Sequence, residues 1–155
     1  PLKPSEFICG YTLPLLPIAL AQGMVCYLAA VCLGLPVRAT ILYAVLFLVP
    51  LSLFFIALGL LFGSFLGVKQ VGGICGALLT NLTAWLSGVW FDLNLVGSTF
   101  KKIAYLFPFV HGVEMERAAL HGNYENIFPH IYWVLAYGIA VFVLASLFFV
   151  RQMKN

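Results

Sequence analysis

The chain has 155 residues, of which 63% are hydrophobic and 8% are charged. Soluble domains carry about 25% charged residues, so this composition excludes an ordinary globular domain and indicates an integral membrane protein. The formal net charge of +3 comes from 8 Lys and Arg against 5 Asp and Glu. It is too small and too scattered along the chain to predict a nucleic-acid partner.

The chain opens on a short polar stretch, residues 1–6, that begins with Pro1 and not with Met. No basic region followed by a short apolar core precedes the first long apolar run, so the pattern does not predict a signal peptide. We expect the chain to be the C-terminal portion of a longer protein. The only charges of this stretch are Lys3 and Glu6.

The first uncharged run covers residues 7–37 and predicts a membrane span near residues 12–34, since a span needs about 20 apolar residues. Pro14 and Pro17 lie in its first half, and proline removes a backbone hydrogen bond from a helix. With Gly10 they are expected to interrupt the helix, which leaves its regular part near residues 15–33.

The second uncharged run, residues 39–68, predicts a span near residues 40–67 with a proline, Pro50, in its middle. Three glycines at four-residue spacing follow near its end: Gly59, Gly63 and Gly67. This doubled G-x-x-x-G pattern favours the close approach of another helix and indicates packing, not chemistry.

The third run predicts a span near residues 70–91 in which every fourth residue is small. Such a stripe is typical of a helix-contact face. Asn81 lies near the expected bilayer midplane beside this stripe, where an amide is costly unless it bonds to a partner or lines a wet path. Asn81, Trp85 and Ser87 are therefore the candidates for a substrate path. The candidate packing face consists of Gly72, Gly76, Thr80, Ala84 and Gly88.

Residues 93–122 are too apolar for a solvated loop and too broken to cross a bilayer. We expect two short helices that dip back into the outer membrane face as a re-entrant or interfacial segment, with a break around Phe107-Pro108. A last apolar run then predicts a span near residues 127–150, with Tyr132 and Trp133 as interfacial anchors. The fold class is thus an all-α polytopic membrane protein, with residues 1–155 forming one transmembrane domain of four spans.

Loop charges bear on orientation. Lys and Arg are equally numerous on the two sides of the four-span arrangement, so counting alone does not decide it. Charge density favours cytoplasmic termini, because Lys69, Arg151 and Lys154 lie in very short loops or tails. The opposite side spreads its basic residues over longer segments that also hold most of the acidic ones.

Catalytic and metal chemistry are not predicted. The four cysteines are dispersed in apolar runs without a C-x-x-C pair, so they read as small buried hydrophobic residues. One cluster of titratable residues is present, at His111, Glu114, Glu116 and His121. It lacks the further ligands that a metal site needs, so we expect an ordinary ion pair between Glu114 and Arg117. No protease motif and no phosphate-binding loop is present, so we expect no enzyme activity and no ATP binding in this chain.

The order of these features resembles the permease subunit of type-two ABC exporters. The resemblance covers essentially the whole chain and is carried by a loose S-G-x-x-F pattern followed by a proline and an arginine. These stand here at Ser87, Gly88, Phe91, Pro108 and Arg117. The departure is length, because that family has about six spans per subunit and an N-terminal segment with two spans has no counterpart here.

The resemblance implies a homodimeric or heterodimeric membrane part driven by two separate ATP-binding cassette subunits, which would hold the ATP and Mg. It implies a bacterial plasma (inner) membrane location and the export of a drug, lipid or glycan along a path between two permeases. Lys3 and Glu6 would then belong to the cytoplasmic connection that meets the ATPase. The alternative is a non-transporting four-span scaffold or assembly factor, which explains the glycine stripes equally well but not the apolar, proline-broken segment 93–122.

Overall fold

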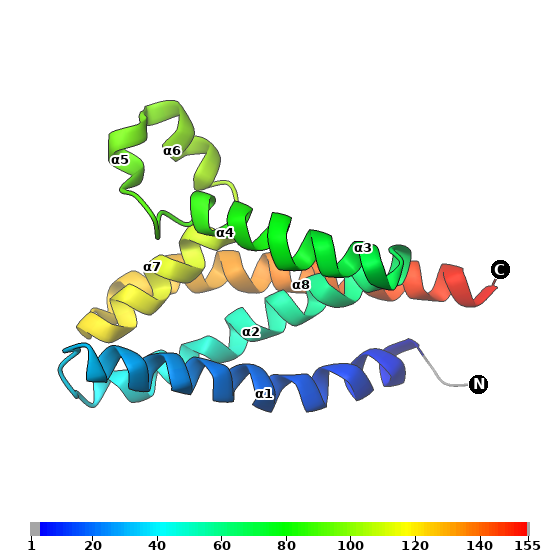
Figure 1. Cartoon of the computed structure of the whole chain (residues 1–155), viewed down its shortest axis with the longest axis horizontal. Coiled ribbons are helices and arrows are strands. Elements are labelled where there is room, and N and C mark those ends of the chain that lie inside the picture. The colour runs from blue at the N-terminus through cyan, green and yellow to red at the C-terminus, as the bar shows by residue number, and fades with distance from the viewer. Residues whose placement is uncertain (1–3, 155) are drawn as a thin grey trace.

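The computed structural model describes residues 4–154, and in that range the regular elements are helices. Three of them are long and apolar enough to cross a membrane: α1 (Pro4–Cys32), α2 (Thr40–Phe65) and α8 (Ile127–Lys154). They run along the long axis of the molecule, and the chain begins and ends at the same end of the bundle (Figure 1). Three of the four expected spans therefore exist as long apolar helices.

The prolines do not interrupt these helices. α1 continues through Pro14 and Pro17, and α2 continues through Pro50. The expectation that regular helix begins only near residue 15 was wrong, because a proline deletes its own N–H bond while the bonds on either side persist. In an apolar run the alternative is to expose many unpaired backbone groups to lipid, which is far more costly.

The third expected span is the one that differs most. It consists of α3 (Val68–Gly73), a π-helical stretch η1 (Ile74–Leu79) and α4 (Thr80–Leu86), which follow one another without a break. The helix ends at Leu86 and not near residue 91, because Ser87 and Gly88 turn the chain and Gly88 has φ +70°. This rod is shorter than the three long helices and is not one continuous α-helix.

The π-helical stretch changes how the small-residue stripe lies. On an α-helix a four-residue repeat advances past one full turn of 3.6 residues, so the stripe drifts around the axis. A π-helix has more residues per turn than an α-helix. Along η1 (Ile74–Leu79) a four-residue step therefore falls short of a full turn, and the stripe rotates back around the axis. Gly72, Gly76 and Thr80 are exposed, so the rest of this chain does not cover that part of the stripe.

The segment expected to hold two short helices holds three: α5 (Leu93–Val96), α6 (Ser98–Ala104) and α7 (Pro108–His121). The break before Pro108 is confirmed, since proline occupies the first turn of α7, where its missing N–H costs nothing. The extra break lies at Gly97, whose φ of +121° only glycine adopts readily. α7 ends at Gly122 in the left-handed conformation, and a short 3₁₀ turn, η2 (Tyr124–Asn126), leads into α8.

The core forms where α2, α7 and α8 meet. α2 packs most extensively against α8, α7 lies against both, and α1 packs along α2 and also contacts α8 (Figure 1). A second small cluster joins Ala44 of α2 to Met115 and Ala119 of α7. The main cluster contains Phe54, Ala57, Leu86, Leu93, Ala104, Phe109, Val110, Val134 and Val141.

One glycine sets the distance between α7 and α2. A Cβ added at Gly112 would lie 2.6 Å from Cδ1 of Leu51, whereas the glycines stressed by sequence spacing, Gly59, Gly63, Gly72 and Gly76, would meet nothing within 4 Å. Among the described residues, Gly59 and Gly63 of α2 therefore make no close helix contact. Close approach occurs instead at Gly112 and at Gly23 of α1, where an added Cβ would lie 2.5 Å from Cδ1 of Leu48.

Gly112→Leu should therefore destabilise the protein by about 1–3 kcal/mol, because the new side chain overlaps Leu51 in a packed interface. Thermal unfolding of the full-length protein in lipid nanodiscs measures this. Gly10→Leu is the matched control, since nothing lies within 4 Å of that site, and it should leave the melting temperature nearly unchanged. The penalty should shrink in a Leu51→Ala background; an equal penalty in both backgrounds would contradict the contact.

Candidate functional site

The turn that follows α4 brings together the residues of the S-G-x-x-F pattern. Ser87 is 2% exposed and donates its hydroxyl to the carbonyl of Ala84, which closes the helix end. Gly88 needs its positive φ and its missing side chain, since a Cβ there would lie 3.0 Å from Leu93. Nη2 of Arg117 on α7 lies 3.5 Å from the Gly88 carbonyl. Residues 29 positions apart therefore meet at this turn.

A polar cavity of about 580 Å³ opens beside this turn, between the end of α4, the α5–α6 hairpin and α7. Figure 1 shows the hairpin standing away from the bundle over this region. Its lining is mainly polar and includes two cations and two anions. The lining residues are Ser87, Gly88, Val89, Trp90, Phe91, Asp92, Leu93, Asn94, Lys101, Tyr105, Glu114 and Arg117.

The charges in this cavity are held by short polar contacts. Asp92 Oδ1 accepts from the backbone N–H of Asn94 at 2.9 Å and from its side-chain amide at 2.8 Å. Lys101 Nζ donates to Asn94 Oδ1 at 2.7 Å and lies 5.8 Å from the centre of the Tyr105 ring. The lining of the α5–α6 side is therefore a connected chain of side chains and not a set of loose charges.

On the α7 side of the cavity Arg117 Nη1 donates to Glu114 Oε1 at 2.9 Å, the ion pair expected from the spacing. The Arg117 side chain is half exposed, so the pair contributes little to stability, about 0–1 kcal/mol. Its effect is positional, because it keeps the guanidinium beside the Gly88 carbonyl.

A histidine pair lies just behind this cavity, between α7 and α8. Nδ1 of His111 lies 2.8 Å from Nδ1 of His130, and Nε2 of His111 lies 3.0 Å from the Tyr105 carbonyl. A carbonyl only accepts, so His111 donates a hydrogen bond through Nε2–H, and its Nδ1 accepts one from Nδ1–H of His130. Burial lowers the pKa of His111, and Trp133 stacks on its ring at 4.9 Å. The pair thus fixes the start of α7 against α8.

A carboxylate faces the other side of α7. Oε2 of Glu116 accepts a hydrogen bond of 2.8 Å from the hydroxyl of Tyr27 on α1. Its Oε1 is buried and has no hydrogen-bond partner among the described residues. Burial raises the pKa of Glu116 to about 7, against the opposing effect of the Tyr27 hydrogen bond. The bond ties α1 to α7 from residues 89 positions apart.

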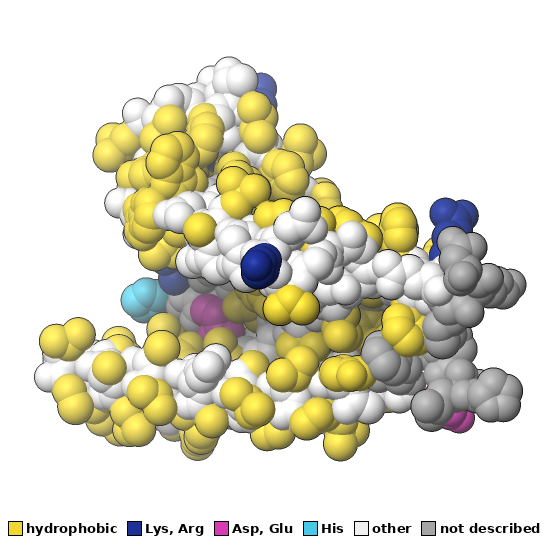
Figure 2. All heavy atoms as spheres, turned by 45° about the vertical axis from the view of Figure 1, so that its right-hand side comes forward, with side chains coloured by type: hydrophobic (Ala, Val, Ile, Leu, Met, Phe, Trp, Pro, Cys, Tyr) yellow, Lys and Arg dark blue, Asp and Glu magenta, His cyan; other side chains and the backbone are white. Residues whose placement is uncertain are grey.

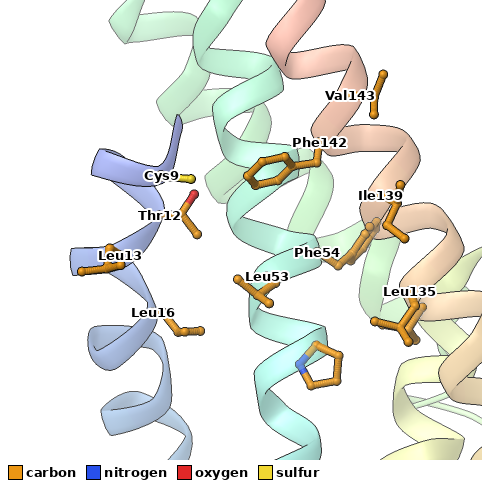
Figure 3. Close-up of a pocket in the computed structure, with 13 residues that line it drawn as sticks. Cys9, Thr12, Leu13, Leu16, Leu53, Phe54, Leu135, Ile139, Phe142 and Val143 are labelled. Atoms are coloured by element: carbon orange, nitrogen blue, oxygen red, sulfur yellow. The ribbon is translucent and has the colours of Figure 1, made fainter. Parts of the chain in front are cut away.

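A separate, apolar cavity of about 440 Å³ lies between α1, α2 and α8. Figure 3 shows Cys9, Thr12 and Leu16 projecting from α1 towards Leu53 and Phe54 of α2 and Phe142 of α8. The hydroxyl of Thr12 is buried and has no partner in the described part of the chain. The cavity suits an aliphatic chain, since almost all of its lining is hydrocarbon.

The residues proposed for a substrate path are not brought together. Ser87 is buried and lines the polar cavity, whereas Asn81 and Trp85 are exposed on the outer side of α4. Asn81 satisfies its amide locally by donating to the Ala77 carbonyl at 2.7 Å. Glu6 is exposed in the first turn of α1, and Lys3 lies outside the described residues, so their role stays a prediction. The cysteines expected to be buried are exposed at Cys9, Cys26 and Cys32 and half-buried at Cys75.

Two participants were missed by sequence reasoning. His130 and Tyr27 lie in apolar runs, where the sequence pattern indicates only membrane spans. His130 pairs with His111, and Tyr27 pairs with Glu116. The available signal was the cluster itself: titratable residues on an amphipathic helix need partners, and an isolated histidine or tyrosine in a neighbouring span is the natural candidate.

The Glu116 carboxyl predicts a pH dependence of stability. Because its folded-state pKa of about 7 lies above the ordinary value of 4.5, ionisation opposes folding. Stability should fall as pH rises from about 4.5 to about 7, by at most about 3 kcal/mol, and then level off. Thermal unfolding between pH 4.5 and 8 measures the slope, which Glu116→Gln should flatten. Glu125→Gln on the exposed 3₁₀ turn is the control, and an unchanged slope in Glu116→Gln would contradict the assignment.

Comparison with known proteins identifies the family of the chain. No match was found among curated proteins or among solved structures. A family model described as "ABC-2 family transporter protein" matches residues 1–147, which is nearly the whole chain. Membership implies a membrane-embedded permease that associates with ATP-binding cassette subunits. The chain therefore belongs to the ABC-2 transporter family.

Proposed function

We propose that this chain is part of the transmembrane subunit of an ATP-driven exporter, which forms a path for a drug, lipid or glycan together with a second permease. ATP and Mg would be bound by separate ATPase subunits, so the chain itself would be no enzyme. The family match supports a permease, and the polar cavity beside the Ser87–Gly88 turn is the observation that carries the export path.

The outer segment supports this proposal through its two unlike surfaces. Leu95 is 84% exposed, and Val96, Ile103, Leu106 and Phe107 are also exposed, so α5 and α6 present apolar side chains outward. Their opposite side lines the polar cavity. Such a segment fits the membrane–water boundary, with lipid around it and a polar chamber under it.

Four passes across the bilayer are the second part of the proposal. Both described ends of the chain lie at one end of the bundle (Figure 1), as an even number of passes requires. The three long helices would make three passes and the α3–η1–α4 rod the fourth. We infer that both termini are cytoplasmic, in a bacterial plasma membrane, and that α5 to α7 form a re-entrant roof on the outer side.

A second permease would cover the exposed face of the α3–η1–α4 rod. Gly72 and Gly76 have open space around them, and Asn81 and Trp85 also face outward. Figure 2 shows hydrophobic side chains scattered over the visible face among backbone and other atoms, with few charged ones. An amide and small residues on such a surface are better suited to a partner helix than to lipid. Asn81 and Trp85 would then border the path between two subunits.

Gly76→Leu tests this interface because the substitution meets nothing within the chain. It should lower the dimer fraction of the full-length protein about tenfold, since a large side chain blocks close helix approach. Light scattering in detergent measures the dimer, and an unchanged melting temperature shows that the subunit itself is intact. Gly10→Leu, equally unobstructed but on α1, should keep the dimer; wild-type assembly in Gly76→Leu would contradict the proposed face.

The contact with the ATPase is proposed at Lys3 and Glu6, on the family resemblance of the segment that contains them. Reversing both charges in the full-length protein should uncouple substrate-stimulated ATP hydrolysis without loss of membrane insertion. Normal stimulated hydrolysis would assign both charges to the membrane edge instead. Co-purification of an ATPase subunit separates the exporter from the scaffold alternative.

A further inference from the structure

We propose that the polar cavity under α5 and α6 binds an uncharged, hydroxyl-rich group, that is, a sugar. The inference rests on the proposed function only in treating that sugar as part of an exported molecule. Its volume of about 580 Å³ is within the usual range for small-ligand sites, roughly 300–1,000 Å³.

The charge balance of the lining favours an uncharged ligand over a strongly charged one. Lys101 and Arg117 are matched by Asp92 and Glu114, so the lining has no formal net charge. These groups are already engaged, Arg117 with Glu114 at 2.9 Å and Lys101 with Asn94 at 2.7 Å. A phosphate or an ammonium group would have to break these contacts to be neutralised, with no surplus charge to compensate.

The same lining suits hydroxyl groups. Each ammonium and guanidinium group has further N–H donors beyond the contacts it makes, and each carboxylate has further lone pairs. A hydroxyl both donates and accepts, so it can bridge neighbouring groups of opposite sign without separating them. Donors and acceptors that alternate around one chamber, as Asp92, Asn94 and Lys101 do here, fit a ring with several hydroxyls.

Two aromatic rings complete the site. Trp90 is 60% exposed at the cavity, and Tyr105 lines it under Lys101. A sugar ring has C–H faces that pack on an aromatic ring while its hydroxyls stay in polar contact, which is the combination of surfaces found here. The apolar outer side of α5 and α6 places the polar chamber at headgroup depth.

Binding is tested with the full-length protein in phosphatidylglycerol nanodiscs, without ATP or ATPase. One arm adds methyl-β-D-glucoside, and a second replaces part of the lipid with monoglucosyl diacylglycerol, with plain diacylglycerol as its control. Hydrogen exchange of residues 92–105 should slow at least fivefold with a sugar-bearing probe. Protection by the free glucoside assigns the site to the sugar alone, and protection only by the glycolipid assigns it to a lipid-linked sugar.

Variants make the test specific. Trp90→Leu should raise the probe concentration needed for half-maximal protection at least tenfold. Trp90→Phe should restore much of the binding because it retains a ring. Tyr132→Leu, which removes an equally exposed ring on α8 outside the cavity, should bind as wild type. No protection by either sugar-bearing probe, equal protection by plain diacylglycerol, or undiminished protection in Trp90→Leu would each overturn the proposal. Because no ATPase takes part in this assay, such a result would contradict the sugar site without testing the permease assignment.

Discussion

The placement of α7 against α2 is the constraint on which the rest of the structure depends. Gly112 lets Leu51 occupy the space of a side chain, so α7 lies flat across α2 and α8. From that position α7 reaches three other elements: His111 meets His130 of α8, Arg117 meets the turn after α4, and Glu116 meets Tyr27 of α1. A shift of α7 would alter all three contacts together, and with them one wall of the polar cavity.

This arrangement explains how a chain with so few charges keeps a polar chamber. Four acidic and basic side chains line that chamber, Asp92, Lys101, Glu114 and Arg117, and each has a partner of opposite sign or an amide. The long helices supply an apolar frame around them. In the exporter we propose, substrate would leave through that frame at the level of the chamber, and a second permease would complete the path along the α3–η1–α4 rod.

Much of the frame follows from the sequence, because uncharged runs of sufficient length have no stable alternative to helix in a bilayer. The break before Pro108 and the end at Gly122 follow from proline and glycine chemistry. The effect of Pro14 and Pro17 was overestimated, since the local cost of one missing bond is small beside that of unwinding an apolar helix. The π-helical stretch at Ile74–Leu79 has no signal in residue spacing that we recognise.

The site was harder to predict, for a physical reason. A glycine permits a close approach but does not require one, so Gly112 could not be distinguished from Gly72 or Gly76 by pattern. The partners of Glu116 and His111 lie in distant apolar runs, and only tertiary packing identifies them. By contrast, Ser87, Gly88 and Arg117, selected by family resemblance, do meet in space.

Topology mapping tests the central claim most directly, namely that the chain makes four passes with α5 to α7 as an outer roof. In a cysteine-free full-length protein, Lys69→Cys, Arg151→Cys and Lys102→Cys would be labelled in turn with a membrane-impermeant maleimide. The account predicts that Lys102→Cys is labelled in intact cells, whereas Lys69→Cys and Arg151→Cys are labelled only after permeabilisation. Labelling of Lys69→Cys and Arg151→Cys from opposite sides, or of Lys102→Cys from the same side as both, would contradict it.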